Sequence, residues 1–210
     1  MRPLTVTLLL LLVFSIPVPL AGANWPKVTE QTVDALVRIQ TYNPHSQDMT
    51  GMCTAFVIED GLAWTAAHCV GHPLNKFTTV APHVDGTPVE IVGIGPYYDV
   101  ALLRHERFTQ TKRTLKMAKK WRLGESVMLV GYETAHTFGP VARQGIVHAI
   151  ANEWLSTSFV SEPGNSGSPV VNEKGEVVGL AVNTAAREDI TTIVTPNALA
   201  KVRILYRIGR

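Results

Sequence analysis

Three short motifs carry the residue types that nucleophilic catalysis requires. Residues 65–69, Thr-Ala-Ala-His-Cys, put His68 just past an expected strand, and Asp99 opens an apolar run, Asp-Val-Ala-Leu-Leu. Residues 163–169, Pro-Gly-Asn-Ser-Gly-Ser-Pro, present Ser166 on a glycine-rich turn. A hydroxyl becomes a nucleophile for acyl carbons when an imidazole takes its proton and a carboxylate orients the imidazole. We therefore predict a catalytic triad of these three residues.

The turn around Ser166 also offers hydrogen-bond donors for the negative charge that such an attack creates. Gly164 allows a tight turn, and we expect Gly167 to leave room for a substrate. The amides of Gly164 and Ser166 are predicted to form an oxyanion hole, in which each donor lowers the barrier by roughly 3–4 kcal/mol. Each motif alone also fits a structural histidine, a strand-entry cap or a plain Gly-Ser loop, so the prediction depends on their coincidence.

The chain order of the three residues narrows the class of protein. Chymotrypsin-type enzymes carry them as His, Asp, Ser, whereas α/β-hydrolases carry them as Ser, acid, His. Ser168 also replaces the last glycine of the hydrolase G-x-S-x-G motif. With these motifs, residues 35–197 resemble the chymotrypsin-fold, trypsin-like serine proteases. Within that fold the chain is most similar to bacterial HtrA-type and glutamyl-endopeptidase-type domains.

The resemblance implies an architecture and an activity. The fold is expected to be two packed six-stranded antiparallel β-barrels, with His68 and Asp99 on the first barrel and Ser166 on the second. The activity is expected to be endopeptidase cleavage of polypeptides through an acyl-enzyme. A PDZ domain, which HtrA proteins normally add at the C-terminal side, is not expected here.

The resemblance also implies a specificity pocket. Val160 aligns with its floor, where trypsins carry an acid, and Val182, Asn183 and Thr184 would flank it. We therefore expect non-tryptic specificity, with a preference for a small or medium apolar residue. Asn165 replaces an Asp that pairs with a newly cut N-terminus in digestive relatives, so no activating cleavage beyond signal removal is expected.

The elements that must bring these residues together are short strands. Brief apolar runs recur along the chain with Gly, Pro, Asn or Asp between most of them, which predicts an all-β fold and not alternating βα units. We assign residues 24–112 to the first barrel and 123–210 to the second. Residues 113–122 are interpreted as a basic, solvated crossover linker. Helical spacing over residues 197–206 predicts a short C-terminal helix.

Composition argues against several other functions. The 210 residues are 46% hydrophobic and 17% charged with a net charge of +2, which suits a globular protein with no evident need for nucleic acid. Two cysteines and scattered histidines lack the close spacing of zinc ligands, so we predict no metal and no cofactor. The sequence does not indicate an oligomeric state.

The N-terminal segment predicts export. In residues 1–23 a basic start, an apolar run and a small-residue end are typical of a cleaved signal peptide. The run is shorter than the roughly 20 residues a spanning helix needs, so we expect no stable membrane insertion and a secreted or periplasmic location. In such an oxidising compartment, Cys53 and Cys69 are predicted to form a disulfide.

Two alternatives remain open at this point. One is a membrane-anchored form in which residues 1–23 are retained. The other is an inactive, protease-like binding module, although such relatives usually lack a member of the triad.

Overall fold

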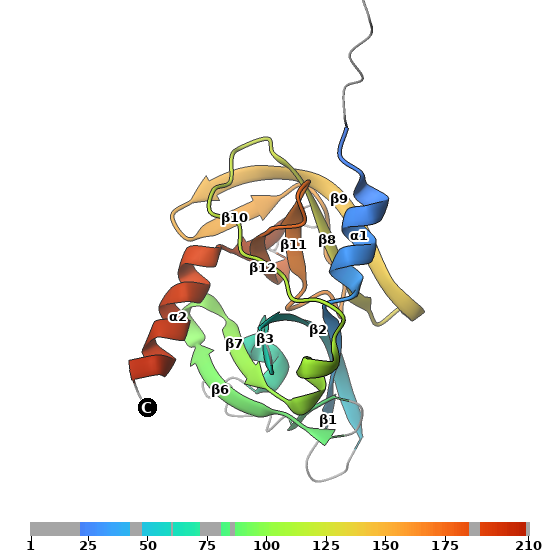
Figure 1. Cartoon of the computed structure of the whole chain (residues 1–210), viewed down its shortest axis with the longest axis vertical. Coiled ribbons are helices and arrows are strands. Elements are labelled where there is room, and N and C mark those ends of the chain that lie inside the picture. The colour runs from blue at the N-terminus through green and yellow to red at the C-terminus, as the bar shows by residue number, and fades with distance from the viewer. Residues whose placement is uncertain are drawn as a thin grey trace, which may run out of the picture.

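Antiparallel strands dominate the structure and form two stacked halves (Figure 1). The computed structural model describes residues 22–42, 48–59, 61–71, 81–84, 87–184 and 190–208. The predicted signal segment lies almost wholly outside these described residues. The strands of the first half are β1 (Leu36–Tyr42), β2 (Met49–Glu59), β3 (Leu62–Ala66), β4 (Ala81–Val84), β5 (Thr87–Pro88), β6 (Glu90–Gly95) and β7 (Val100–Arg104). Those of the second half are β8 (Ser126–Glu133), β9 (His136–Ala151), β10 (Trp154–Thr157), β11 (Pro169–Asn172), β12 (Val177–Thr184) and β13 (Thr191–Val194).

The all-β class and the barrel of the second half are confirmed. The six strands of this half close in the order β10-β13-β12-β11-β8-β9. The first half is a seven-stranded antiparallel sheet in the order β5-β4-β1-β2-β3-β7-β6, where six strands in a closed barrel were expected. The difference arises because the short β4–β5 hairpin pairs with β1 and extends that edge, while β6 ends the other edge.

The two halves are held together by strands of the second barrel that are buried on both faces. In β8, Val127 and Leu129 point into the barrel core, whereas Met128 and Val130 belong to the core that the barrel shares with the first half. β11 alternates in the same way, with Val170 inside the barrel. Because side chains alternate across a strand, a continuous apolar run serves two cores at once.

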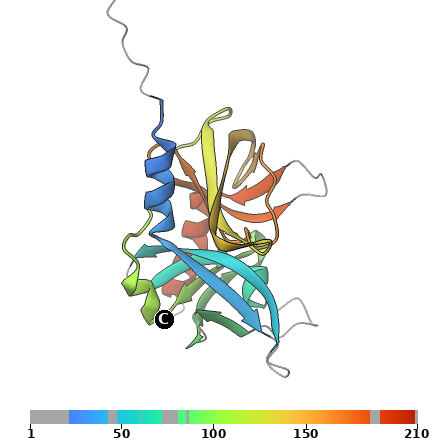
Figure 2. The same ribbon diagram turned by 90° about the vertical axis from the view of Figure 1, so that its right-hand side faces the viewer.

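Two helices lie on the outside of these halves. Helix α1 (Trp25–Val33) begins where Asn24 Oδ1 accepts from Lys27 N (3.2 Å), a regular N-cap. Although the sequence places these residues with the first barrel, α1 contacts β8 of the second half (Figure 2). Helix α2 (Pro196–Ile208) covers the predicted helical tail and contacts both β6 and β12, so it also links the halves.

The basic crossover is anchored to both halves. Leu115 and Ala118 are buried, Leu115 N donates to Val57 O (2.8 Å), and Ala118 N donates to Val177 O (2.8 Å). Lys116 between these apolar positions, and Lys119 and Lys120 after them, remain exposed. The crossover is thus solvated on one face only.

In the part of the chain that the structure describes, no helix is both long enough and apolar enough to span a membrane.

Candidate active site

Strand pairing in the first half brings His68 and Asp99 together. In the β3–β7 ladder, Ala66 lies opposite Val100. His68 follows β3 in the short 3-10 turn η1 (Ala67–Val70), and Asp99 immediately precedes β7. Residues just beyond the paired ends of adjacent antiparallel strands are neighbours, so the ladder register places the imidazole beside the carboxylate.

The contact between His68 and Asp99 is two-pronged. Asp99 Oδ2 lies 2.6 Å from His68 Nδ1, and Asp99 Oδ1 accepts from the His68 amide at 2.9 Å. An ionised carboxylate can only accept hydrogen bonds, so Nδ1 carries the proton and Nε2 is left as the acceptor. Asp99 takes a left-handed backbone conformation (φ 55°), which is uncommon for a residue with a side chain and is enriched in Asp.

Ser166 lies on the loop between β10 and β11, against the first half of the molecule. Its carbonyl accepts from Thr54 N (2.9 Å) on β2 and lies 4.0 Å from Cys69 Sγ. Cys69 is joined to Cys53 in a disulfide, and a ring nitrogen of His68 lies within 4.8 Å of both sulfur atoms. The disulfide therefore stands between the histidine turn and the serine loop.

The Ser166 side chain is half-buried and is not hydrogen-bonded to His68. No bond joins Ser166 Oγ to the ring among the residues that the structure describes. In substrate-free sites such bonds are often long and tighten only when substrate binds. The structure thus brings His68 and Asp99 into direct contact and places Ser166 on the neighbouring loop.

The backbone amides of residues 162–168, the part of the serine loop around Ser166, fall into two groups. Those of Glu162, Asn165, Gly167 and Ser168 donate to acceptors within the protein. Those of Gly164 and Ser166 have no acceptor within the described residues. Two free amides that are two residues apart, on either side of Asn165, suit an oxyanion hole, which needs donors not already used by the protein.

Gly164 and Gly167 are needed because backbone packs closely against them. A Cβ on Gly167 would lie 2.1 Å from Thr54 O, and one on Gly164 would lie 2.8 Å from Tyr132 O. Both glycines have positive φ, 103° at Gly164 and 84° at Gly167. The expectation that Gly167 leaves room for substrate is therefore wrong, because the space beside its Cα is filled by β2 and β3.

Sequence reasoning missed Thr54, which connects the serine loop to two strands. Its Oγ1 donates to Gly164 O (2.9 Å) and accepts from Tyr132 N (2.9 Å), and its carbonyl accepts from Thr65 Oγ1 (2.7 Å). Thr54 is fully buried. Threonine is common in strands, so its residue type gave no indication of this role. The one signal in the sequence was its position next to Cys53.

Replacing Thr54 with valine should therefore loosen the serine loop. The isosteric change removes the donor to Gly164 O and the acceptor for Tyr132 N, and we expect about 1–3 kcal/mol loss in the free energy of unfolding. Denaturant unfolding measures this loss. Thr32→Val is the matched control, since Thr32 is equally buried but bonds only within α1. Equal stability of the Thr54 and Thr32 variants would contradict the connecting role.

Asn165 is fully buried and ties the loop to β8. Its Nδ2 donates to Tyr132 O (2.9 Å), and its Oδ1 accepts from Glu162 N (2.9 Å). Both ends of the amide are thus satisfied without a charged partner. An aspartate here would direct a carboxylate oxygen at the Tyr132 carbonyl, and the two oxygens would repel each other. The structure therefore favours Asn at this position, where digestive relatives carry Asp.

The predicted specificity pocket is described only in part. Val160 is half-buried and Val182 is buried in the shared core, while the side chains of Asn183 and Thr184 lie outside the described residues. The pocket therefore stays a prediction. A surface hollow of about 1270 Å³, lined by residues 119–126, the 172–176 turn and Asn197, contains none of the predicted site residues.

The cluster of Cys53, Cys69 and His68 does not provide a metal site. Metal ligation by cysteine needs a free thiolate, and both sulfur atoms are already joined to each other. The disulfide instead packs between the histidine turn and the serine loop.

Comparison with known proteins agrees with the fold and with the family that the motifs predicted. Residues 53–180 match the trypsin-like peptidase domain, so the chain belongs to this family, as the motifs predicted. A serine protease HtrA-like protein of Staphylococcus haemolyticus is 27% identical over 172 residues, covering 73% of this chain and 26% of that protein. A probable periplasmic serine endoprotease DegP-like protein of Pseudomonas putida is 34% identical over 136 residues, covering 60% and 28%.

Solved structures share the fold at lower identity. The active form of the Rv3671c protease from M. tuberculosis superposes with a TM-score of 0.69 at 21% identity, covering 84% of this chain and 82% of that one. By contrast, this chain spans only about a quarter of the length of the two sequence relatives.

Proposed function

We propose that this protein is an exported serine endopeptidase that cleaves polypeptides with Ser166, His68 and Asp99. One observation carries the proposal: Asp99 Oδ2 lies 2.6 Å from His68 Nδ1, a contact that favours the tautomer with a free Nε2, and the neighbouring serine loop has free amides at Gly164 and Ser166. These are the base, the orienting acid and the oxyanion donors that acyl transfer needs. Membership of the trypsin-like peptidase family supports the same conclusion.

The reaction would proceed in two halves. Ser166 Oγ bonds to the peptide carbonyl carbon while its proton passes to His68 Nε2, and the oxyanion accepts hydrogen bonds from the Gly164 and Ser166 amides. The carbon–nitrogen bond then breaks as His68 returns the proton to the leaving amine. Water next attacks the ester with the same histidine as base, which releases the acid and restores the Ser166 hydroxyl.

The proposed location is outside the cytoplasm. The segment 1–23 supports export, and one relative is described as periplasmic. The disulfide beside the active site fits an oxidising compartment. Polypeptides are the proposed substrates, and residue 160 favours an apolar side chain over a basic one in the pocket.

Covalent labelling tests this function directly. A fluorophosphonate probe should react with the wild-type protein, because Ser166 Oγ attacks phosphorus and fluoride leaves. Peptide mapping should place the adduct on Ser166, and the Ser166→Ala variant should stay unlabelled. If the folded wild-type protein takes up no probe, the binding-module alternative replaces the enzyme.

A further inference from the structure

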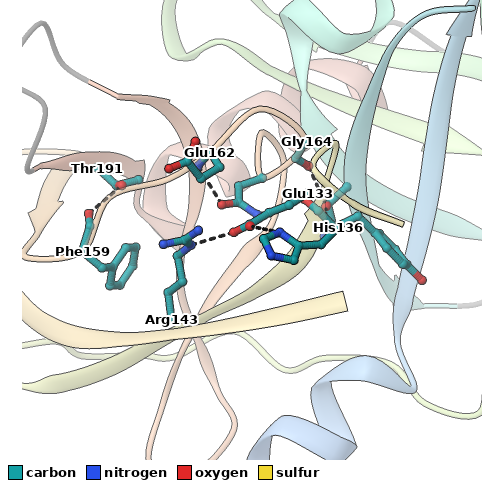
Figure 3. A network of polar contacts seen from close by, with 10 residues as sticks. Glu133, His136, Arg143, Phe159, Glu162, Gly164 and Thr191 are labelled. Atoms are coloured by element: carbon teal, nitrogen blue, oxygen red, sulfur yellow. Dashed lines mark hydrogen bonds and ion pairs between the residues drawn. The ribbon is translucent and has the colours of Figure 1, made fainter. Parts of the chain in front are cut away.

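Glu133, at the end of β8, is the single charged residue that is fully buried in the described part of the chain. Its side chain is 1% exposed. Its carboxylate accepts a hydrogen bond from Nε of Arg143, a residue of β9, at 2.6 Å. The carboxylate also lies 3.0 Å from His136 Nδ1. Figure 3 shows these two partners meeting Glu133 from different sides, close to Glu162 and Gly164. The proposed mechanism uses none of the three side chains of Glu133, Arg143 and His136.

The Glu133–Arg143 pair stays ionised. Burial raises the pKa of Glu133, but the hydrogen bond and the charge of Arg143, together with the contact to His136, outweigh it and leave the pKa below its usual value. The hydrogen bond to Glu133 also raises the pKa of Arg143. A buried ion pair contributes little net stability compared with an apolar pair, because desolvating both charges is costly. Its presence here therefore needs another reason.

The backbone around Glu133 packs directly against the serine loop. Thr134 N donates to Pro163 O (2.8 Å), and the side-chain Nδ2 of Asn165 donates to Tyr132 O (2.9 Å). A Cβ on Gly164 would lie 2.9 Å from Glu133 Cα. Residues 132–134 thus contact every residue from Pro163 to Asn165, including the one whose amide is a proposed oxyanion donor.

This supporting backbone is irregular and needs a side-chain anchor. The β8–β9 register shifts between Gly131 and Glu133, so the regular ladder is interrupted directly beneath the serine loop. The ion pair spans this interruption, since Arg143 lies on β9 opposite Leu129, on the regular side of the shift. The irregular strand end is thereby fixed to the body of the barrel.

We infer that the Glu133–Arg143 pair is a positioning device for the oxyanion hole. It holds residues 132–134 in place, and through them the Gly164 amide. This inference rests on the proposed function. It also agrees with the expectation that no activating cleavage beyond signal removal is needed, because the Glu133–Arg143 pair is already present in the folded chain.

The test compares Glu133→Gln and Arg143→Gln with the wild-type protein. Glu133→Gln is isosteric and leaves Arg143 without its counter-charge, while Arg143→Gln breaks the same pair from its more exposed end. With quenched fluorescent casein as substrate, each should lower kcat by between about tenfold and a hundredfold with KM nearly unchanged, because the donor is displaced, not removed. The fluorophosphonate reaction should slow in parallel.

Three comparisons separate positioning from general destabilisation. The double variant should lose no more kcat than the worse single variant, since the two residues act as a unit. Arg143→Lys, which keeps the charge, should recover most of the activity. Glu59→Gln breaks the ion pair that joins the end of β2 to Arg203 on α2, away from the serine loop, and should leave kcat unchanged.

The outcomes also distinguish this inference from the proposed function. Wild-type protein that never reacts with the probe refutes the peptidase itself. Reactive wild-type protein whose Glu133→Gln and Arg143→Gln variants are folded and fully active refutes only the positioning role. A drop in the unfolding temperature with unaltered kcat below that temperature would equally overturn it.

Discussion

Replacing Ser166 with alanine is expected to lower kcat by about six orders of magnitude, the loss seen when a triad nucleophile is removed. The loss should be in kcat because the missing oxygen is the one that would bond to the substrate carbonyl, whereas the Gly164 and Ser166 amides remain. Cleavage of quenched fluorescent casein under saturating conditions measures it, with residual activity set by the oxyanion donors and substrate binding.

Ser168 provides a matched control within the same loop. Its Oγ is buried and has no hydrogen-bond partner within the described residues, so Ser168→Ala removes a hydroxyl without breaking a bond. This variant should keep near-normal kcat. If both serine variants remained active, the nucleophile would have to be sought elsewhere in the chain.

Asp99→Asn is expected to lower kcat by about four orders of magnitude with little change in fold. The amide can present an N–H to His68 Nδ1, which then acts as acceptor and places the ring proton on Nε2, facing the serine. In this tautomer Nε2 already carries a proton, so His68 cannot accept the proton of Ser166. The comparison of kcat for the variant and the wild-type protein near neutral pH measures this effect.

The control for this change is Asp34→Asn, at the end of α1. Asp34 has a similar side-chain exposure, 26% against 30%, and lies within ion-pair distance of Lys112 and Arg113. Losing a surface ion pair should cost at most about 1 kcal/mol of stability and no activity. Comparable kcat values for the two asparagine variants would remove Asp99 from the mechanism.

The local motifs determined the class of protein and its candidate residues. His68, Asp99 and Ser166 could be found without coordinates because each sits in a short run whose neighbours are dictated by the turn or strand it occupies. The apolar runs determined the all-β class for a similar reason, since alternation and turn residues are properties of neighbouring positions. The C-terminal helix also followed from local spacing, beginning at Pro196.

Only the tertiary structure decided how these residues are supported. Thr54 and Glu133 carry no motif, and their roles arise from contacts with a loop that is 110 and about 30 positions away. The role of Gly167 changed for the same reason, since what fills the space beside it comes from Thr54 and Thr65. Packing between distant segments depends on the register of whole strands, which neighbouring residues do not encode. The sequence therefore predicted which groups react, and the fold determined how those groups are held.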